Sequence, residues 1–215
     1  MSSSGSRLDQ VLRDPRVWRA GRVTARARAT VSSGWPELDE ALNGGWPLGQ
    51  LTELLIDAHG VGEFALLLPA LRGLMMSQRR GTQDDWVALA SFPHIPYAPA
   101  LARAGIDLSR LLLIRSGRDS DTLWAMEQAL HARACAAVVG WSDSRDVVSL
   151  RRLQLAAEAG NAWTVLFRSA RLQSLRSPAP LRIRLLRESG RDRLELRVLK
   201  RRDGPAVVVG VDTGR

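Results

Sequence analysis

Five short apolar runs, separated by segments of helix length, limit the possible folds of this chain more than any other feature. The runs lie within residues 51–56, 86–91, 106–116, 135–141 and 162–169. Wholly apolar runs such as 135–141 are typical of strands that a parallel sheet buries on both faces. We expect helices up to about residue 78 and over 94–105, 120–133 and 144–160, with Ser120 or Asp121 capping the third. This alternation predicts an α/β fold with a mostly parallel sheet, right-handed crossovers and flanking helices.

The end of the chain changes its period. Residues 181–186 and 193–200 alternate apolar with charged side chains at period two, and a turn sequence separates them. We therefore predict antiparallel hairpin strands at the C-terminal end, with residues 206–212 as a further strand. One face of the hairpin packs on the core in this prediction. Arg182, Arg184 and Arg197 lie on the other face, with Glu195 among them.

The first thirty residues differ from the rest. We predict a helical arm and a basic linker over residues 1–30, and one α/β domain over residues 31–215. The arm has too little apolar surface to fold alone. It therefore either docks on a partner or folds back on its own domain, through Leu8, Leu12, Val17 and Trp18.

Positive charge is concentrated near the two ends of the chain. The formal net charge is +9, and Lys200 is the one lysine among 31 basic residues. Residues 168–202 carry 12 basic and 3 acidic side chains, hence +9, and residues 7–28 carry 7 and 2, hence +5. Residues 29–167 carry 11 basic and 15 acidic side chains, hence −4. Such asymmetry fits contact with nucleic acid or with an acidic protein, and a merely solvated surface is the alternative.

Seven basic side chains near the C-terminal end are the candidates for such contact. They are Arg182, Arg184, Arg187, Arg197, Lys200, Arg201 and Arg202. No aromatic residue interleaves with them, so stacking on single-stranded bases is not indicated. They predict sequence-independent contact with a phosphate backbone, or with an acidic protein surface.

Several classes of protein are disfavoured by composition. A single cysteine, Cys135, excludes an internal disulfide and a cysteine-rich zinc site, and the three histidines lack metal-ligand spacing. No apolar run approaches the ~18 residues of a membrane span, and residues 1–14 lack the apolar core of a signal peptide. We expect a cytoplasmic protein without a metal or cofactor.

Residues 51–68, LTELLIDAHGVGEFALLL, have the strand, glycine-bearing turn and helix of a phosphate-binding loop. The pattern G-x-x-x-x-G-K-[ST] would place its first glycine at Asp57, its lysine at Glu63 and its hydroxyl at Phe64; Gly62 alone fits. Glu63 reverses the charge that should face the phosphates, and Phe64 removes a Mg²⁺ ligand. We therefore predict that the chain is not an enzyme and has no functional nucleotide site.

An ordered series of segments resembles the core of the RecA recombinase family. The segments are VSSGWPELDEALNGGWPLGQLTELL, WVALASFPHIPYAPALARAGIDLSRLLLIRS and DTLWAMEQALHARACAAVVGWSDSRD, and the likeness extends over residues 31 to about 210. The resemblance implies a RecA-like core. Pro93 stands at the place of the catalytic glutamate, Gly140 at the place of the Walker B aspartate, and Arg168-Ser169 at the place of a polar nucleotide sensor.

A RecA-like core without ATP chemistry resembles the ImuA family, the accessory proteins of SOS-inducible mutagenesis cassettes. The resemblance implies an adaptor in translesion DNA synthesis that acts with ImuB, with an alternative subunit of the replicative polymerase and with RecA. The alternative is a SulA-type cell-division inhibitor that binds FtsZ. Chain length and the segment 31–55 favour ImuA.

Overall fold

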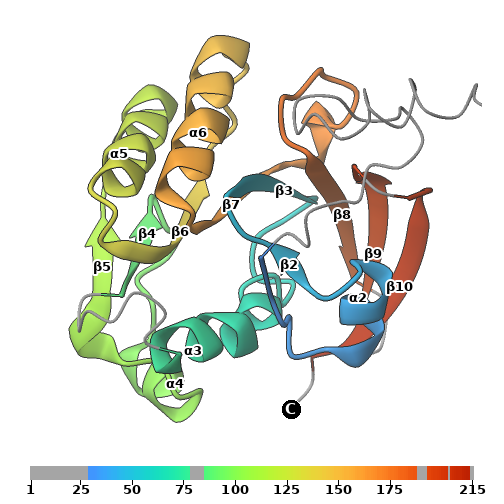
Figure 1. Ribbon diagram of the computed structural model, residues 1–215, viewed down its shortest axis with the longest axis horizontal. Helices are drawn as coiled ribbons and strands as arrows, with labels where there is room; N and C mark the ends of the chain where they lie inside the picture. The colour runs from blue at the N-terminus through green and yellow to red at the C-terminus, as the bar shows by residue number, and fades with distance from the viewer. Residues whose placement is uncertain (1–28, 78–84, 188–192, 203, 214–215) are drawn as a thin grey trace, which may run out of the picture.

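An eight-stranded sheet forms the centre of the computed structural model, which describes residues 29–77, 85–187, 193–202 and 204–213 (Figure 1). The strand order is β10-β9-β8-β3-β7-β6-β4-β5. The bounds are β3 (Gln50–Ile56), β4 (Trp86–Ala90), β5 (Leu111–Ile114), β6 (Cys135–Trp141), β7 (Trp163–Ser169), β8 (Leu181–Arg187), β9 (Arg193–Lys200) and β10 (Val207–Asp212). The α/β prediction is confirmed. The arm residues Leu8, Leu12, Val17 and Trp18 lie outside the described residues.

The sheet is parallel from β5 to β8 and antiparallel at its other end. Strand β8 pairs parallel with β3, whereas β9 is antiparallel to both β8 and β10. The hairpin predicted from the period-two pattern is therefore confirmed. A short antiparallel pair, β1 (Thr30–Val31) with β2 (Trp46–Pro47), lies apart from the main sheet.

Helices cover both faces of the parallel part. On one face lie α5 (Asp119–His131) and α6 (Val147–Gly160), packed over β4, β6 and β7 (Figure 1). The opposite face is covered by α3 (Leu68–Met76) and α4 (Ala98–Arg103), while α2 (Pro36–Ala41) packs against β10. Short 3-10 turns lie at Ala65–Leu67 (η1), Leu108–Arg110 (η2) and Ala170–Leu172 (η3). Within the described residues, no helix combines the length and apolarity that crossing a membrane requires.

The ends of α5 and α6 show how local sequence sets these helices. Asp146 caps α6 by accepting the Val148 N–H, and Asn161 ends it in the left-handed conformation. Helix α5 begins one residue earlier than predicted, after Arg118, whose side chain makes no capping bond. The prediction of Ser120 or Asp121 as its cap is wrong, because both residues already lie inside the first turn.

The carboxyl ends of β3, β4, β6 and β7 meet at one edge of the sheet, because these strands are parallel. In open α/β sheets this edge is where ligands bind. The phosphate-loop segment follows β3 and Pro93 follows β4, while Gly140 and Arg168 are the next-to-last residues of β6 and β7. The candidate functional site therefore lies at this edge of the sheet.

Candidate functional site

The loop after β3 is closed on itself by a carboxylate. Glu63 is buried, and its Oε1 accepts the Gly60 N–H at 2.9 Å. Gly62 has a φ of 96°, a conformation that residues with a side chain rarely adopt, so the loop requires glycine there whether or not a phosphate binds. Asp57, at the first position of the pattern, accepts Arg184 Nη2 at 2.8 Å with both carboxylate oxygens. The loop thus directs carboxylates, and no lysine, toward its own backbone and toward β8.

Four aromatic rings meet beside this loop. Phe64 contacts Phe92 edge to face, with ring centroids 5.0 Å apart, and Phe92 lies 4.5 Å from Trp141. Trp141 stacks on Phe167 at 4.7 Å, with an angle of 17° between the planes. The chain has three phenylalanines, and all three are in this aromatic cluster. Aromatic rings therefore pack together where a nucleotide site would gather its hydroxyl, carboxylates and polar sensor.

The position of the Walker B aspartate is also filled. A Cβ added to Gly140 would lie 2.3 Å from Met126 Sδ, and Met126 is fully buried. The thioether of α5 therefore occupies the space that a carboxylate at this position would need. Any larger residue at Gly140 would force Met126 to move.

A polar cavity of about 410 Å³ borders the aromatic cluster, and its lining includes Trp141, Phe167 and Arg168. Asp57, Asp119 and Asp143 also line it. Asp143 accepts the Ser169 N–H at 2.6 Å, and Asp119 accepts the Asp143 N–H at 3.1 Å. The lining thus holds three carboxylates and one guanidinium group, and this excess of negative charge would repel a polyphosphate. Among the described residues, no group of three or more His, Cys, Asp or Glu side chains is placed to hold a metal ion.

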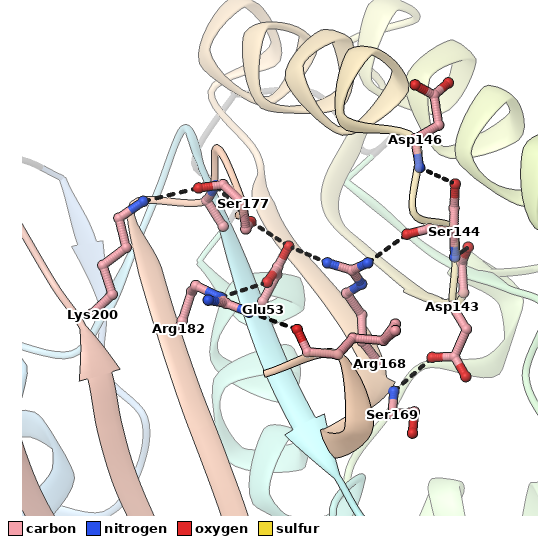
Figure 2. A network of polar contacts seen from close by, with 12 residues as sticks. Glu53, Asp143, Ser144, Asp146, Arg168, Ser169, Ser177, Arg182 and Lys200 are labelled. Atoms are coloured by element: carbon pink, nitrogen blue, oxygen red, sulfur yellow. Dashed lines mark hydrogen bonds and ion pairs between the residues drawn. The ribbon is translucent and has the colours of Figure 1, made fainter. Parts of the chain in front are cut away.

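On the other face of the sheet, one buried carboxylate links three segments of the chain (Figure 2). Glu53 in β3 is fully buried and accepts Arg168 Nη1 at 2.9 Å and Arg182 Nε at 2.8 Å. It also accepts the hydroxyl of Ser177. Arg168 in turn donates to the Ser144 carbonyl, and Lys200 donates to the Ser177 carbonyl at 3.1 Å. We call Glu53, Arg168, Arg182 and Ser177 the Glu53 network.

Sequence reasoning missed the Glu53 network. Glu53 lies inside the apolar run 51–56, and a charged side chain is almost never buried unless it is paired. That single carboxylate was the available signal for a buried cationic partner. The partners could not be named, because they lie 115, 124 and 129 residues away along the chain.

Arg182 lies on the predicted face of the hairpin, but it is buried there. Residues 170–180 cover that part of the face, and Arg182 Nη2 donates to the Leu172 carbonyl at 3.4 Å. Arg182 is therefore unavailable for surface contact in this structure.

The other six basic candidates do not form one surface. Arg184 and Arg197 are opposite each other on β8 and β9, and Arg197 pairs with Glu195 as predicted. Arg201 is half-buried and donates to the Ala41 carbonyl of α2, while Arg187, Lys200 and Arg202 are exposed. Burial, reinforced by Arg182 and Arg202, lowers the pKa of Lys200, and Glu53 acts in the opposite direction.

Comparison with known proteins identifies two groups of relatives. The chain is 33% identical over 140 residues to Protein ImuA of Caulobacter vibrioides, a match that covers 63% of this chain and 55% of that protein. It is 28% identical over 132 residues to the cell division inhibitor SulA of Serratia proteamaculans, covering 61% of this chain and 75% of that protein. A SulA of Edwardsiella piscicida is 30% identical over 97 residues. No protein-family model matches.

The matched part of the chain therefore spans about half of the ImuA relative. The matches to ImuA combine higher identity with more matched residues than either SulA match. They confirm the predicted resemblance to ImuA, and they support membership of the ImuA family.

Proposed function

We propose that this chain is a non-catalytic RecA-like adaptor of an SOS-inducible mutagenesis system. The ImuA matches, which support membership of that family, are the reason for this proposal. In this proposal it works in translesion DNA synthesis beside ImuB and an alternative subunit of the replicative polymerase, with RecA as a further partner. An adaptor to a DNA polymerase would act in the cytoplasm. The sheet provides a rigid scaffold, and the surfaces around it make the contacts.

The aromatic cluster is the observation that carries the non-catalytic part of the proposal. Phosphoryl transfer needs a bound Mg²⁺, a cation at the phosphates and a positioned base. Phe64 packs where the metal-binding hydroxyl would be, and Met126 fills the space at Gly140. Glu63 adds a repulsion of about 4 kcal/mol per phosphate charge at ~4 Å and an effective dielectric of about 20. We infer that the Glu63 carboxylate takes the place of a bound phosphate in the loop.

Isothermal titration of the full chain with Mg²⁺ and ATP tests this part. We expect no binding at millimolar ATP. Micromolar binding that requires Mg²⁺ and that Gly62→Val abolishes would overturn the non-catalytic proposal.

Co-purification tests the adaptor proposal. Tagged protein is offered ImuB and FtsZ in equal amounts, with and without single-stranded DNA. Capture of ImuB is the expected result. Capture of FtsZ alone would contradict the adaptor proposal.

A cell-division inhibitor is the second candidate function, because the Serratia SulA match covers 75% of that protein. Such a protein would bind FtsZ and block its assembly. Overexpression would then give filamentous cells, whereas an adaptor of polymerases would leave cell length unchanged.

Direct contact with DNA remains a further part of the proposal. Arg187, Lys200 and Arg202 are exposed and can approach a phosphate backbone, while Arg184 and Arg197 are partly neutralised by Asp57 and Glu195. Binding of this kind weakens steeply with salt and hardly depends on sequence. Anisotropy titrations of two unrelated oligonucleotides at several salt concentrations would measure both properties.

A further inference from the structure

We propose that a groove between α6 and the loop 175–178 is the docking site for an acidic, leucine-rich segment of a partner protein. This inference deepens the proposed adaptor function and rests on it, because an adaptor needs a surface that selects its partner. The groove has a volume of about 480 Å³. One wall is made by Val147, Val148, Arg151 and Arg152 of α6, and the other by residues 176–178.

Apolar side chains are exposed along the α6 wall. Val147 and Val148 in this wall are 49% and 69% exposed. Two leucines outside the lining, Leu155 of α6 and Leu175 next to Arg176, are 49% and 37% exposed. Val148 and Leu155 are seven residues apart, so they lie on the same side of the helix. Single exposed apolar residues are ordinary, whereas several beside a groove indicate a site of interaction. The groove can therefore bury apolar side chains of a partner.

The rim of the groove is positively charged. Within the described part of the chain, Arg151 and Arg176 make no ion pair, while Arg152 is bound to Glu127 at 2.6 Å. The nearby acidic residue, Asp146, is engaged by the Val148 N–H and the Ser149 hydroxyl. The amino end of α6 adds a partial positive charge to this end of the groove. Carboxylates of a partner would thus find two uncompensated guanidinium groups.

The Glu53 network holds both walls in place. Arg168 bridges Glu53 to the Ser144 carbonyl, and the Ser144 hydroxyl accepts the Asp146 N–H at the start of α6 (Figure 2). On the other side, Ser177 donates its hydroxyl to Glu53 and accepts Lys200 with its carbonyl. A site held by buried ion pairs loses little conformational entropy when a ligand binds. The network therefore prepares the groove for a partner.

The sign of the charge selects the occupant. The arm of this chain carries +5 over residues 7–28, so the rim repels it. Nucleic acid would match the charge but leave the exposed valines without apolar partners, and no aromatic ring for base stacking is among the described residues that line the groove. An amphipathic segment with Glu or Asp on one side and Leu on the other satisfies both features.

Two labelled peptides test the proposal on the full chain. One is a fluorescein-labelled 16-residue helix former made of Glu, Leu and Ala in amphipathic order, and the other carries Lys at each Glu position. Fluorescence anisotropy should show binding of the glutamate peptide and much weaker binding of the lysine peptide. R151E/R176E should weaken the glutamate peptide at least tenfold and strengthen the lysine peptide. V148D should also weaken the glutamate peptide.

R72E/R103E is the matched control, because it makes the same change of net charge on α3 and α4, on the opposite face of the sheet. It should alter binding less than threefold. Equal loss in this control and in R151E/R176E would overturn the groove and leave a general charge effect. Stronger binding of a 16-nucleotide single strand, lost in R151E/R176E, would also overturn it in favour of nucleic acid.

Capture of ImuB by the same variants separates this inference from the proposed function. Loss of capture in R151E/R176E, with capture kept in R72E/R103E, would support both. Loss of the peptide with capture intact would support the groove and assign it to another acidic partner. No capture by the wild type would count against the adaptor function, whereas selective peptide binding would still support the groove.

Discussion

Phe167 and Arg168 are neighbours near the end of β7, and their side chains point to opposite faces of the sheet. Each belongs to one of two contrasting clusters. Phe167 packs in the aromatic cluster, a group of four rings in mutual contact. Arg168 enters the Glu53 network, where three charges are kept and buried. The aromatic cluster depends on shape and burial, so each ring contributes separately. The Glu53 network depends on its hub, because removing Glu53 leaves two guanidinium groups buried without an anion.

The largest effect should follow removal of the hub of the Glu53 network. Glu53→Ala leaves Arg168 and Arg182 buried without an anion, and we expect a loss of about 3–5 kcal/mol in the free energy of unfolding. Urea titration followed by tryptophan fluorescence measures it. Glu195→Ala is the control, because Glu195 also pairs with an arginine but at the surface, where such a pair is worth at most about 1 kcal/mol.

Replacing the whole ionic group sharpens this test. Glu53→Leu with Arg168→Met and Arg182→Met removes every charge together, and apolar replacement of a buried ionic group is often neutral. The triple variant should therefore be more stable than Glu53→Ala. A Glu53→Ala variant as stable as Glu195→Ala would refute the assignment of Glu53 as the hub.

The next largest effect should come from the centre of the aromatic cluster. Trp141→Ala removes a buried ring that contacts Phe64, Phe92 and Phe167, and should cost about 3 kcal/mol. Trp124→Ala is the matched control, since Trp124 on α5 is 60% exposed, and should change stability by no more than about 0.5 kcal/mol. Thermal unfolding followed by circular dichroism compares the two. Equal losses would mean that the cluster adds nothing beyond a surface tryptophan.

The fold could be predicted from the sequence because its signals are local. The apolar run 135–141 and the period-two run 193–200 each contain within themselves the pattern of a buried or half-buried strand. Both became strands with bounds close to those expected. The alternation along the chain then predicted a mostly parallel sheet with right-handed crossovers, but it gave no order for the strands.

The site was harder to predict because its contacts connect distant strands. Alternation correctly assigned Arg182 to the face away from the main core, but it cannot show that residues 170–180 cover that face. The aromatic cluster left a weak signal, since all three phenylalanines come shortly after or inside strands that end at one edge. The sequence predicts that Glu63 and Gly140 stand where a nucleotide site would have its lysine and its aspartate; it could not show that Met126 and the aromatic rings fill the space beside them.

An attempt to rebuild the phosphate loop should not give ATP hydrolysis. The test separates the contribution of the loop residues from that of the aromatic cluster. Glu63→Lys with Phe64→Ser restores the lysine and the hydroxyl of the pattern but leaves Asp57, Pro93 and Gly140 unchanged. We expect no ATP hydrolysis above wild type in a phosphate-release assay. We also expect a loss of about 2 kcal/mol in stability, since a buried acceptor and a packed ring are removed. Glu63→Gln, which keeps an acceptor for the Gly60 N–H, should lose less.

Mg²⁺-dependent hydrolysis by the rebuilt variant would show that the aromatic cluster leaves room for nucleotide. That result would mean that the residues at positions 63 and 64, and not the packing of the other rings, prevent hydrolysis in the wild type.

The smallest effect concerns a carboxylate outside both clusters. Burial acts to raise the pKa of Asp39, but hydrogen bonds from the Ser32 hydroxyl at 2.6 Å and the Ser33 N–H at 2.7 Å lower it overall from its ordinary 3.8. A lowered pKa in the folded state means that the ionised group stabilises the fold fully above pH 3.8, and that this contribution fades as the pH falls further. Asp39→Asn should therefore be less stable than wild type at pH 6, by less than about 1 kcal/mol. Urea titrations should show the difference constant from pH 6 to pH 5 and shrinking below pH 3.8. A difference that stayed constant down to pH 3 would mean that the Asp39→Asn variant loses stability through altered hydrogen bonding rather than through loss of the charge.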